Sequence, residues 1–483
     1  MNSKGHVNLT YVNDSGKHTT GIKNVKEEDL YSIDLSDKIQ KVENYDPYLH
    51  RTVEHPLSNT ETIIHLLKSS LGTGILAMPQ AIYHAGWLLG SIGTVAIGLI
   101  AVYSMQILLS SHYELCKRRK VPSMDYPAIA QNALLEGPQW LHRYASLVVH
   151  ITNGFLWTYQ IGSCCIYVVF IGGNIKSIVD YFTQADNDIR LFMLMILLPI
   201  IFINWVRNLK YLAPFSTLAN SVTVISFAVI FYFIFREPIV LEGRRPVGPL
   251  SEIPFFIGTV LFSLESVGVI MPLENEMRTP RSYVGVTGVL SRAFAVIVIL
   301  YIGMGLFGYL KYGDVIRESI TLNLEINDQI DNILAQSVKA MLAFGGIALK
   351  FFTGIFITHG IACYVAIDIT WNKYIVDRIS NDRHKLLWEY VVRTVIVLIT
   401  FLLAVAIPKL DLFISLFGAF CLSTLGLAFP ALIETLVFLK EKSGTARTMM
   451  IIKNTIISIF GLCALIIGTS TSVLAIIESF TKK

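Results

Sequence analysis

The sequence contains few charged residues for its length. Of 483 residues, 15% are charged and 53% are hydrophobic, whereas soluble domains carry about 25% charged residues. This composition excludes an ordinary soluble protein and indicates an integral membrane protein. The net charge of +4 is spread over short loops, so the concentrated basic face that nucleic-acid binding requires is missing. We therefore expect a lipid bilayer, and no nucleic acid, as a partner.

Enzyme and metal signatures are also absent from the sequence. No G-x-S-x-G, H-E-x-x-H or Walker-type loop occurs, which argues against an enzyme and against an ATP-driven pump. The six cysteines show neither zinc-ligand nor C-x-x-C spacing, and we expect them to be free thiols, most of them buried. No metal site and no cofactor is predicted.

Residues 1–55 contain no long apolar run, in contrast to the rest of the chain. The segment is polar and of mixed charge, so we expect a disordered cytosolic tail and no cleaved signal peptide. Residues 56–480 are predicted to form the transmembrane domain. Its apolar segments predict eleven spanning helices, at 58–85, 87–110, 142–173, 190–206, 211–236, 254–273, 283–312, 333–372, 386–407, 410–439 and 449–477.

Loop charges predict the orientation. The loops after the second, eighth and tenth spans are basic and would share one side, while the loop between spans seven and eight is acidic. The positive-inside rule then places the N-terminus in the cytosol. The loop with Arg244 and Arg245 is basic but predicted to be external, which weakens this assignment without reversing it.

The predicted architecture is all-α, with two inverted repeats of five helices and one extra helix. The first repeat covers about 58–236, the second about 254–439, and the extra helix about 449–477. In such leucine-transporter-like folds, the first helix of each repeat is interrupted near the middle of the membrane. Span one contains Gly72-Thr73-Gly74, and span six contains Ser263, Glu265, Ser266 and Gly268, so both satisfy this condition.

A broken helix provides a binding site for a zwitterion. Amides of the half-helix that starts near Ile75 would bind a carboxylate, and glycines allow a ligand to approach the backbone. Carbonyls and hydroxyls in span six would accept hydrogen bonds from an ammonium group. The alternative is that the glycines only allow tight helix packing, but interruptions in both helices favour a site. The candidate substrate-binding residues are Ser70, Gly72, Thr73, Gly74, Ile75, Phe262, Ser263, Glu265 and Ser266.

Two residues are candidates for proton coupling. His65 lies two turns before Gly72, and histidine as a residue type suits proton transfer near neutral pH, although the position of His65 alone favours a histidine at the cytosolic interface. Glu265 is an acid at mid-membrane, where such residues are usually functional. It would either exchange a proton or hold the interrupted helix in shape.

The segment "TETIIHLLKSSLGTGILAMPQAIYHAGWLLG" (60–90) resembles the proton-coupled amino acid transporters of the amino acid/auxin permease group. Further matches are "YQIGSCCIYVVF", "VGVIMPLENEM", "YGDVIRESITLNL" and "FPALIE", and "YDPYLHRTVEHP" resembles the insect members. The resemblance implies an eleven-helix symporter of small neutral amino acids (alanine, glycine or proline), with the proton as coupling ion. It assigns proton coupling to His65 and carboxylate binding to the Gly-Thr-Gly motif. It also implies the plasma membrane or the endosomal or lysosomal membrane.

Two other functions remain open at this stage. One is a proton-independent facilitator or exchanger, and the other is an amino-acid-sensing transceptor with growth-signalling partners bound through the N-terminal tail. Leu264 and Ser266 replace an aromatic residue and a glycine of many relatives. The preferred amino acid therefore does not follow from the resemblance.

Overall fold

The computed structural model describes residues 9–12, 18–21, 45–51, 53, 56–207, 213–236, 238–264, 267–324, 333, 335–337, 355–379 and 382–481. Contacts divide the chain into a small unit, Met1–Thr52 with Cys116–Ser123, and a large unit with all other residues. In the small unit, strands β1 (Leu9–Val12) and β2 (His18–Gly21) pair antiparallel. A 3-10 helix, η1 (Pro47–His50), follows. Most of the predicted disordered tail lies outside the described residues, so its disorder stays a prediction.

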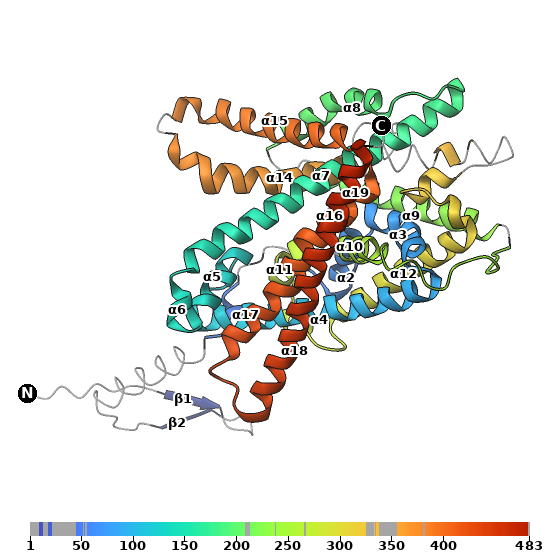
Figure 1. Ribbon diagram of the computed structural model, residues 1–483. Helices are drawn as coiled ribbons and strands as arrows, with labels where there is room; N and C mark the ends of the chain where they lie inside the picture. Colours follow the sequence, from blue (N-terminus) through green and yellow to red (C-terminus); the bar gives the residue numbers. More distant parts are fainter. Residues whose placement is uncertain are drawn as a thin grey trace, which may run out of the picture. The chain divides into compact units, whose positions relative to one another are not determined.

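The large unit is helical (Figure 1). Its α-helices are α2 (Asn59–Ser70), α3 (Thr73–Ala85), α4 (Trp87–Arg119), α5 (Tyr126–Glu136), α6 (Gln139–His142), α7 (Ala145–Thr183), α8 (Ile189–Asn204), α9 (Ala213–Phe235), α10 (Ile253–Ser263), α11 (Val267–Glu276), α12 (Val289–Tyr312), α14 (Ile355–Thr370), α15 (Asp382–Ala406), α16 (Leu410–Phe417), α17 (Phe429–Phe438), α18 (Gly444–Cys463) and α19 (Thr469–Thr481). Short 3-10 helices are η3 (Pro280–Ser282), η4 (Gly313–Val315), η5 (Ile320–Asn323) and η7 (Val376–Arg378). π-helical segments are η6 (Trp371–Ile375), η8 (Gly418–Ala428) and η9 (Ala464–Gly468).

Helices α2 and α3 begin and end for identifiable local reasons. Ser58 and Glu61 form a reciprocal capping box at the start of α2, in which the Ser58 amide donates to the Glu61 carboxylate at 2.8 Å. The helix ends at Ser70, and Leu71 and Gly72 adopt non-helical backbone angles before α3 starts at Thr73. The segment predicted as one span at 58–85 is therefore two short helices.

Helix α3 lies in the centre of the large unit and packs against both α10 and α12. Glycines allow these close approaches, because small residues let helix backbones come together in membranes. A Cβ atom at Gly308 of α12 would lie 2.6 Å from Pro79 Cγ of α3. One at Gly74 would lie 2.7 Å from Ser263 Cα of α10.

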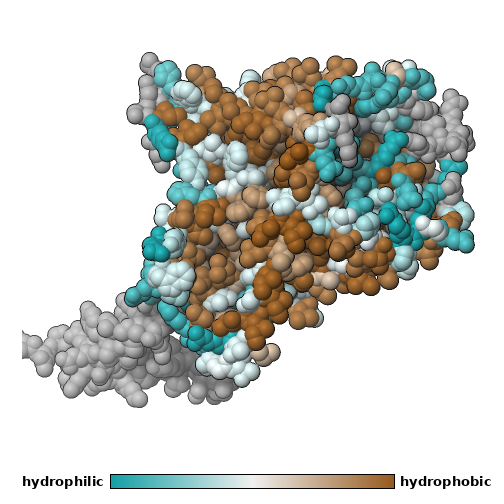
Figure 2. All heavy atoms as spheres, in the orientation of Figure 1, coloured by the Kyte–Doolittle hydropathy of each residue, from teal (hydrophilic) through white to brown (hydrophobic). Residues whose placement is uncertain are grey.

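The surface of the large unit is rich in exposed apolar side chains. Along α18, Ile452, Ile456 and Ile459 are each more than half exposed, and Figure 2 shows apolar residues over much of the visible face. A soluble protein would bury such a surface. This pattern fits contact with lipid chains.

Among the described residues, seven helical stretches are long and apolar enough to span a membrane, and 189–204 and 224–235 are shorter apolar helices. Helices α2 and α3, which make up the first predicted span, are each too short to be counted among these seven stretches. Most of 333–354, the first part of the eighth predicted span, lies outside the described residues. The number eleven therefore stays a prediction. One helix that we did not predict, α5, packs between α7 and α17.

Candidate functional site

The end of α2, the start of α3 and the end of α10 lie close together inside the large unit. Because Gly74 has no side chain, the first turn of α3 lies directly against Ser263, the last residue of α10. Ser70, Thr73 and Ser263 are all buried. The structure thus brings together the junction between α2 and α3 and the end of α10.

Tyr301 of α12 connects these two helix ends. Its side chain is fully buried, and its single hydroxyl proton is shared between the Ser263 carbonyl, at 2.6 Å, and the Ser70 carbonyl. The last carbonyls of a helix lack intrahelical donors, so one hydroxyl stabilises the ends of both α2 and α10. No local sequence pattern indicates this role, because a tyrosine in an apolar span is common.

The start of α3 presents backbone donors. Gly72 is the N-cap and no side chain caps the first turn, which leaves the first amides of α3 available to an acceptor. A Cβ atom at Gly72 would meet no atom of the described residues within 4 Å, so they leave the space next to it open. The buried Ser70 Oγ has no hydrogen-bond partner in the described part of the chain. A small anionic group would find uncompensated donors here.

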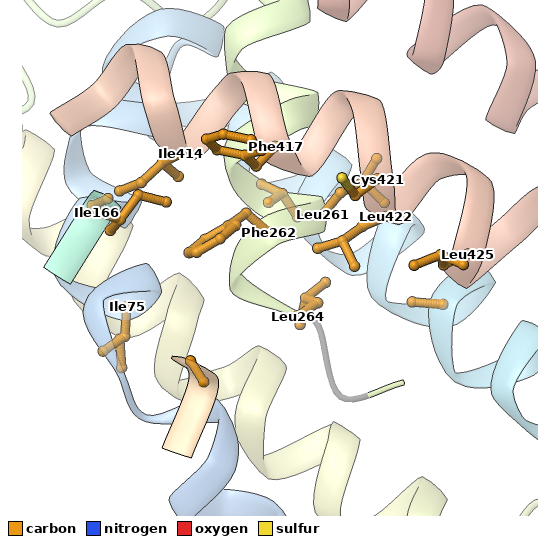
Figure 3. Close-up of a cluster of buried hydrophobic side chains, with 14 of the residues drawn as sticks. Ile75, Ile166, Leu261, Phe262, Leu264, Ile414, Phe417, Cys421, Leu422 and Leu425 are labelled. Atoms are coloured by element: carbon orange, nitrogen blue, oxygen red, sulfur yellow. The ribbon is translucent and has the colours of Figure 1, made fainter. Parts of the chain in front are cut away.

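Two residues next to this point belong to a cluster of buried apolar side chains (Figure 3). Ile75 of α3 and Phe262 of α10 belong to a buried cluster with Ile166, Ile414 and Phe417. The Phe262 ring also lies 6.0 Å from the Tyr159 ring of α7, measured between centroids. The polar groups are therefore few and in an apolar environment, as in most small-molecule sites.

The remaining candidates of span six are only partly described. The Ser263 hydroxyl donates to the Thr259 carbonyl at 2.7 Å, and its oxygen remains able to accept a hydrogen bond. Glu265 and Ser266 lie outside the described residues, between the end of α10 and the start of α11 at Val267. Their predicted roles are untested.

His65 lies on an exposed part of α2. It is one turn after Glu61 of the capping box and interacts electrostatically with that carboxylate. Histidine side chains in general take up and release protons near neutral pH, which a proton carrier requires. Its role in coupling stays a prediction.

The sequence of this chain matches the family described as transmembrane amino acid transporter protein over residues 55–474. The chain belongs to this family. The transporter is 35% identical over 439 residues to "Proton-coupled amino acid transporter-like protein pathetic" of Drosophila melanogaster, which covers 91% of this chain and 89% of the relative. It is 25% identical to "Probable amino acid transporter skat-1" of Caenorhabditis elegans, with 88% and 92% covered.

A solved structure shares the fold of the transporter. The inward-facing conformation of Mhp1 matches with a TM-score of 0.50 and 10% sequence identity, over 90% of this chain and 92% of that chain. At this identity the similarity concerns the fold alone. The family and the seven apolar helices among the described residues confirm that the chain is a multi-pass membrane transporter and not an enzyme.

Proposed function

We propose that this transporter moves small neutral amino acids together with protons by alternating access. The single observation that carries the proposal is the open space at the uncapped start of α3, which directly faces the end of α10. The substrate carboxylate binds the first amides of α3, at Thr73, Gly74 and Ile75. The Ser70 hydroxyl supplies one further donor.

The substrate ammonium group binds the acceptors on the opposite side. The Ser263 hydroxyl oxygen and the carbonyls that Tyr301 holds in place are the described acceptors there. Glu265 and Ser266 follow directly in sequence and complete this side in the proposal. The side chains of Ile75 and Phe262 limit the space for the substrate side chain. This limited space favours alanine, glycine or proline over larger amino acids.

The overall architecture in this proposal has eleven spans in two inverted repeats. Two features support it: within the first predicted span α2 ends at Ser70 and α3 begins at Thr73, and within the sixth, about 190 residues later, α10 ends at Ser263 and α11 begins at Val267. Broken helices are tolerated in a membrane only where they line a cavity or are buried in protein. The moving parts would be α2 and α11, and α12 would carry the Tyr301 connection.

Proton coupling rests on the similarity to the Drosophila relative named for it and on His65. We assign His65 as the proton carrier on the cytosolic half of the interrupted helix. The transporter would act at the plasma membrane or at an endosomal or lysosomal membrane, with its N-terminus in the cytosol. A growth-signalling partner of the N-terminal tail belongs to the sensor alternative.

The test is uptake of radiolabelled alanine, glycine and proline into proteoliposomes, with and without an inward proton gradient. We expect gradient-stimulated uptake by the wild type and loss of that stimulation in His65→Ala. His142→Ala is the matched control, because this histidine lies on the short helix α6 and contacts the Gly137 carbonyl. Uptake that does not change with the proton gradient would indicate a proton-independent exchanger. Binding of the amino acid without uptake would indicate an amino-acid sensor.

A further inference from the structure

The ring of Phe417, the last residue of α16, lies where α7 has no side chain. A Cβ atom at Gly162 of α7 would overlap with Cγ, Cδ1 and Cδ2 of this ring. A glycine allows such a close approach because it carries no side-chain atom. Phe417 can therefore occupy its place only because residue 162 is a glycine.

The same end of α16 also packs against Phe262 of α10. Gly418 follows Phe417 directly, and a Cβ atom at Gly418 would lie 3.0 Å from Phe262 Cβ. Phe262, Ile414 and Phe417 belong to one buried cluster, and in Figure 3 Ile414 and Phe417 extend from their helix toward Phe262. The two phenylalanines are 7% and 8% exposed. The end of α16 therefore borders the space in which the Phe262 ring lies.

A second neighbour of the Phe262 ring is Tyr159 of α7. The two ring centroids are 6.0 Å apart, and Tyr159 lies about one helical turn before Gly162 on the same helix. Helix α7 thus provides a ring at one turn and a gap at the next, and Phe417 fills the gap. Protein interiors leave few voids larger than a water molecule. The Phe262 ring has no room to turn toward α16 while Phe417 is in place.

We propose that Phe417 and Gly162 determine the largest substrate side chain that the transporter accepts, because together they fix the position of the Phe262 ring. The inference rests on the proposed function, in which Phe262 limits the space for the substrate side chain. Phe417 is a positioning residue, since it acts through Phe262. Its effect on selectivity is large, because one methylene group in an apolar pocket changes discrimination by about 10- to 200-fold.

The test is competition for binding to the purified protein. Radiolabelled alanine is displaced by unlabelled glycine, alanine, proline or leucine, and the measured quantity is the ratio of the inhibition constant of leucine to that of alanine. A variant with only a structural defect binds all four amino acids more weakly and keeps this ratio. A variant with a larger space for the substrate side chain lowers it.

Phe417→Ala removes the ring and gives Phe262 room to turn away from the substrate. We expect the leucine-to-alanine ratio to fall by about tenfold or more, with the smallest change for glycine, which has no side chain to place. Phe417→Leu fills more of the same volume and should give a smaller fall in the same direction. If Phe417→Ala does not fold, Phe417→Leu decides.

Gly162→Ala tests whether the glycine acts through the Phe417 ring. In the wild-type background its methyl group displaces the ring, so the ratio should change. In the Phe417→Ala background the methyl group no longer meets a ring, and its effect on the ratio should be smaller. Such non-additivity is expected of residues in contact. Equal effects in the two backgrounds would reject the role of Gly162.

Phe256→Ala is the matched control. Phe256 lies on the same helix as Phe262, is 3% exposed and also packs against a glycine, because a Cβ atom at Gly93 of α4 would lie 2.8 Å from its Cε1 atom. Its removal leaves a comparable cavity on the side of α4. The leucine-to-alanine ratio should therefore stay at the wild-type value.

An unchanged ratio in Phe417→Ala and Phe417→Leu would overturn the proposal, and so would an equal fall in Phe256→Ala. Alanine uptake by the wild type with and without a proton gradient is measured in parallel. A shifted ratio without a gradient effect would reject proton coupling and keep the role of Phe417, whereas a gradient effect with an unchanged ratio would do the reverse. If the wild type binds none of the four amino acids, both proposals are rejected.

Discussion

Tyr301→Phe tests the connection between the two helix ends with the loss of one oxygen atom. The ring is fully buried and stays in place, whereas the hydroxyl that donates to the Ser70 and Ser263 carbonyls is removed. The Ser70 carbonyl keeps a second donor, the Gly72 amide at 2.9 Å. The carbonyl that is left without its donor in Tyr301→Phe is therefore mainly that of Ser263, at the end of α10.

The expected loss of stability follows from the free-energy cost of leaving one buried carbonyl without its hydrogen-bond donor. Removing the donor to a buried carbonyl costs about 1 to 3 kcal/mol. If the substrate needs the native arrangement of these two helix ends, the same free energy reduces its affinity by about 5- to 150-fold. We expect the dissociation constant for alanine to rise within this range and the thermal stability of the purified protein to fall.

The assay is equilibrium binding of radiolabelled alanine to the purified protein, with thermal unfolding of the same samples. The matched control is Tyr309→Phe, a second buried tyrosine of α12, whose hydroxyl accepts from the Arg245 amide at 3.2 Å. This change should reduce stability and leave alanine affinity within about twofold, since a site mutation acts mainly through its own contacts. Wild-type affinity in Tyr301→Phe, or an equal loss in Tyr309→Phe, would refute the reasoning.

Further predictions concern Gly74, Gly72 and Glu318. Gly74→Ala places a Cβ atom 2.7 Å from Ser263 Cα, so we expect a loss of about 1 to 3 kcal/mol of stability by thermal unfolding, and unchanged stability would argue against this contact. The methyl group of Gly72→Ala meets no atom of the described residues within 4 Å, so this variant should fold normally, yet bind alanine more weakly because the methyl group occupies the open space. Burial, with repulsion from Asp411, raises the pKa of Glu318 to about 7. The folded protein thus binds the Glu318 proton more tightly than the unfolded chain does, and stability should fall by at most about 3 kcal/mol as the pH rises from about 4.5 to about 7. Glu318→Gln should flatten this part of the stability profile, and an unchanged profile would exclude Glu318 as its cause.

Sequence patterns predicted the helical membrane fold and the family, because long apolar runs and the Gly-Thr-Gly motif are local signals. They also predicted that Ser70, Gly74 and Ser263 would lie near one another. Hydropathy alone did not separate α2 from α3, since the apolar run is continuous through the interruption. It also missed α5, whose 11 residues are too few for a span.

The contacts made by Tyr301 and by Phe417 were beyond sequence analysis. Tyr301 lies 38 residues from Ser263 and 231 from Ser70 in the chain, and Phe417 packs against Gly162 of a helix far away in the chain. No pattern within one helix indicates which distant group its side chain meets. Only the packing of α12 against α2 and α3, and of α16 against α7, brings these groups together.

The central claim is that the substrate binds where α3 begins, opposite the end of α10. A cryo-electron microscopy map of the purified transporter with saturating alanine tests this most directly. The account predicts density for alanine beside Gly72, with its carboxylate at the amides of Thr73, Gly74 and Ile75. Alanine density at another site, with this space empty, would contradict it.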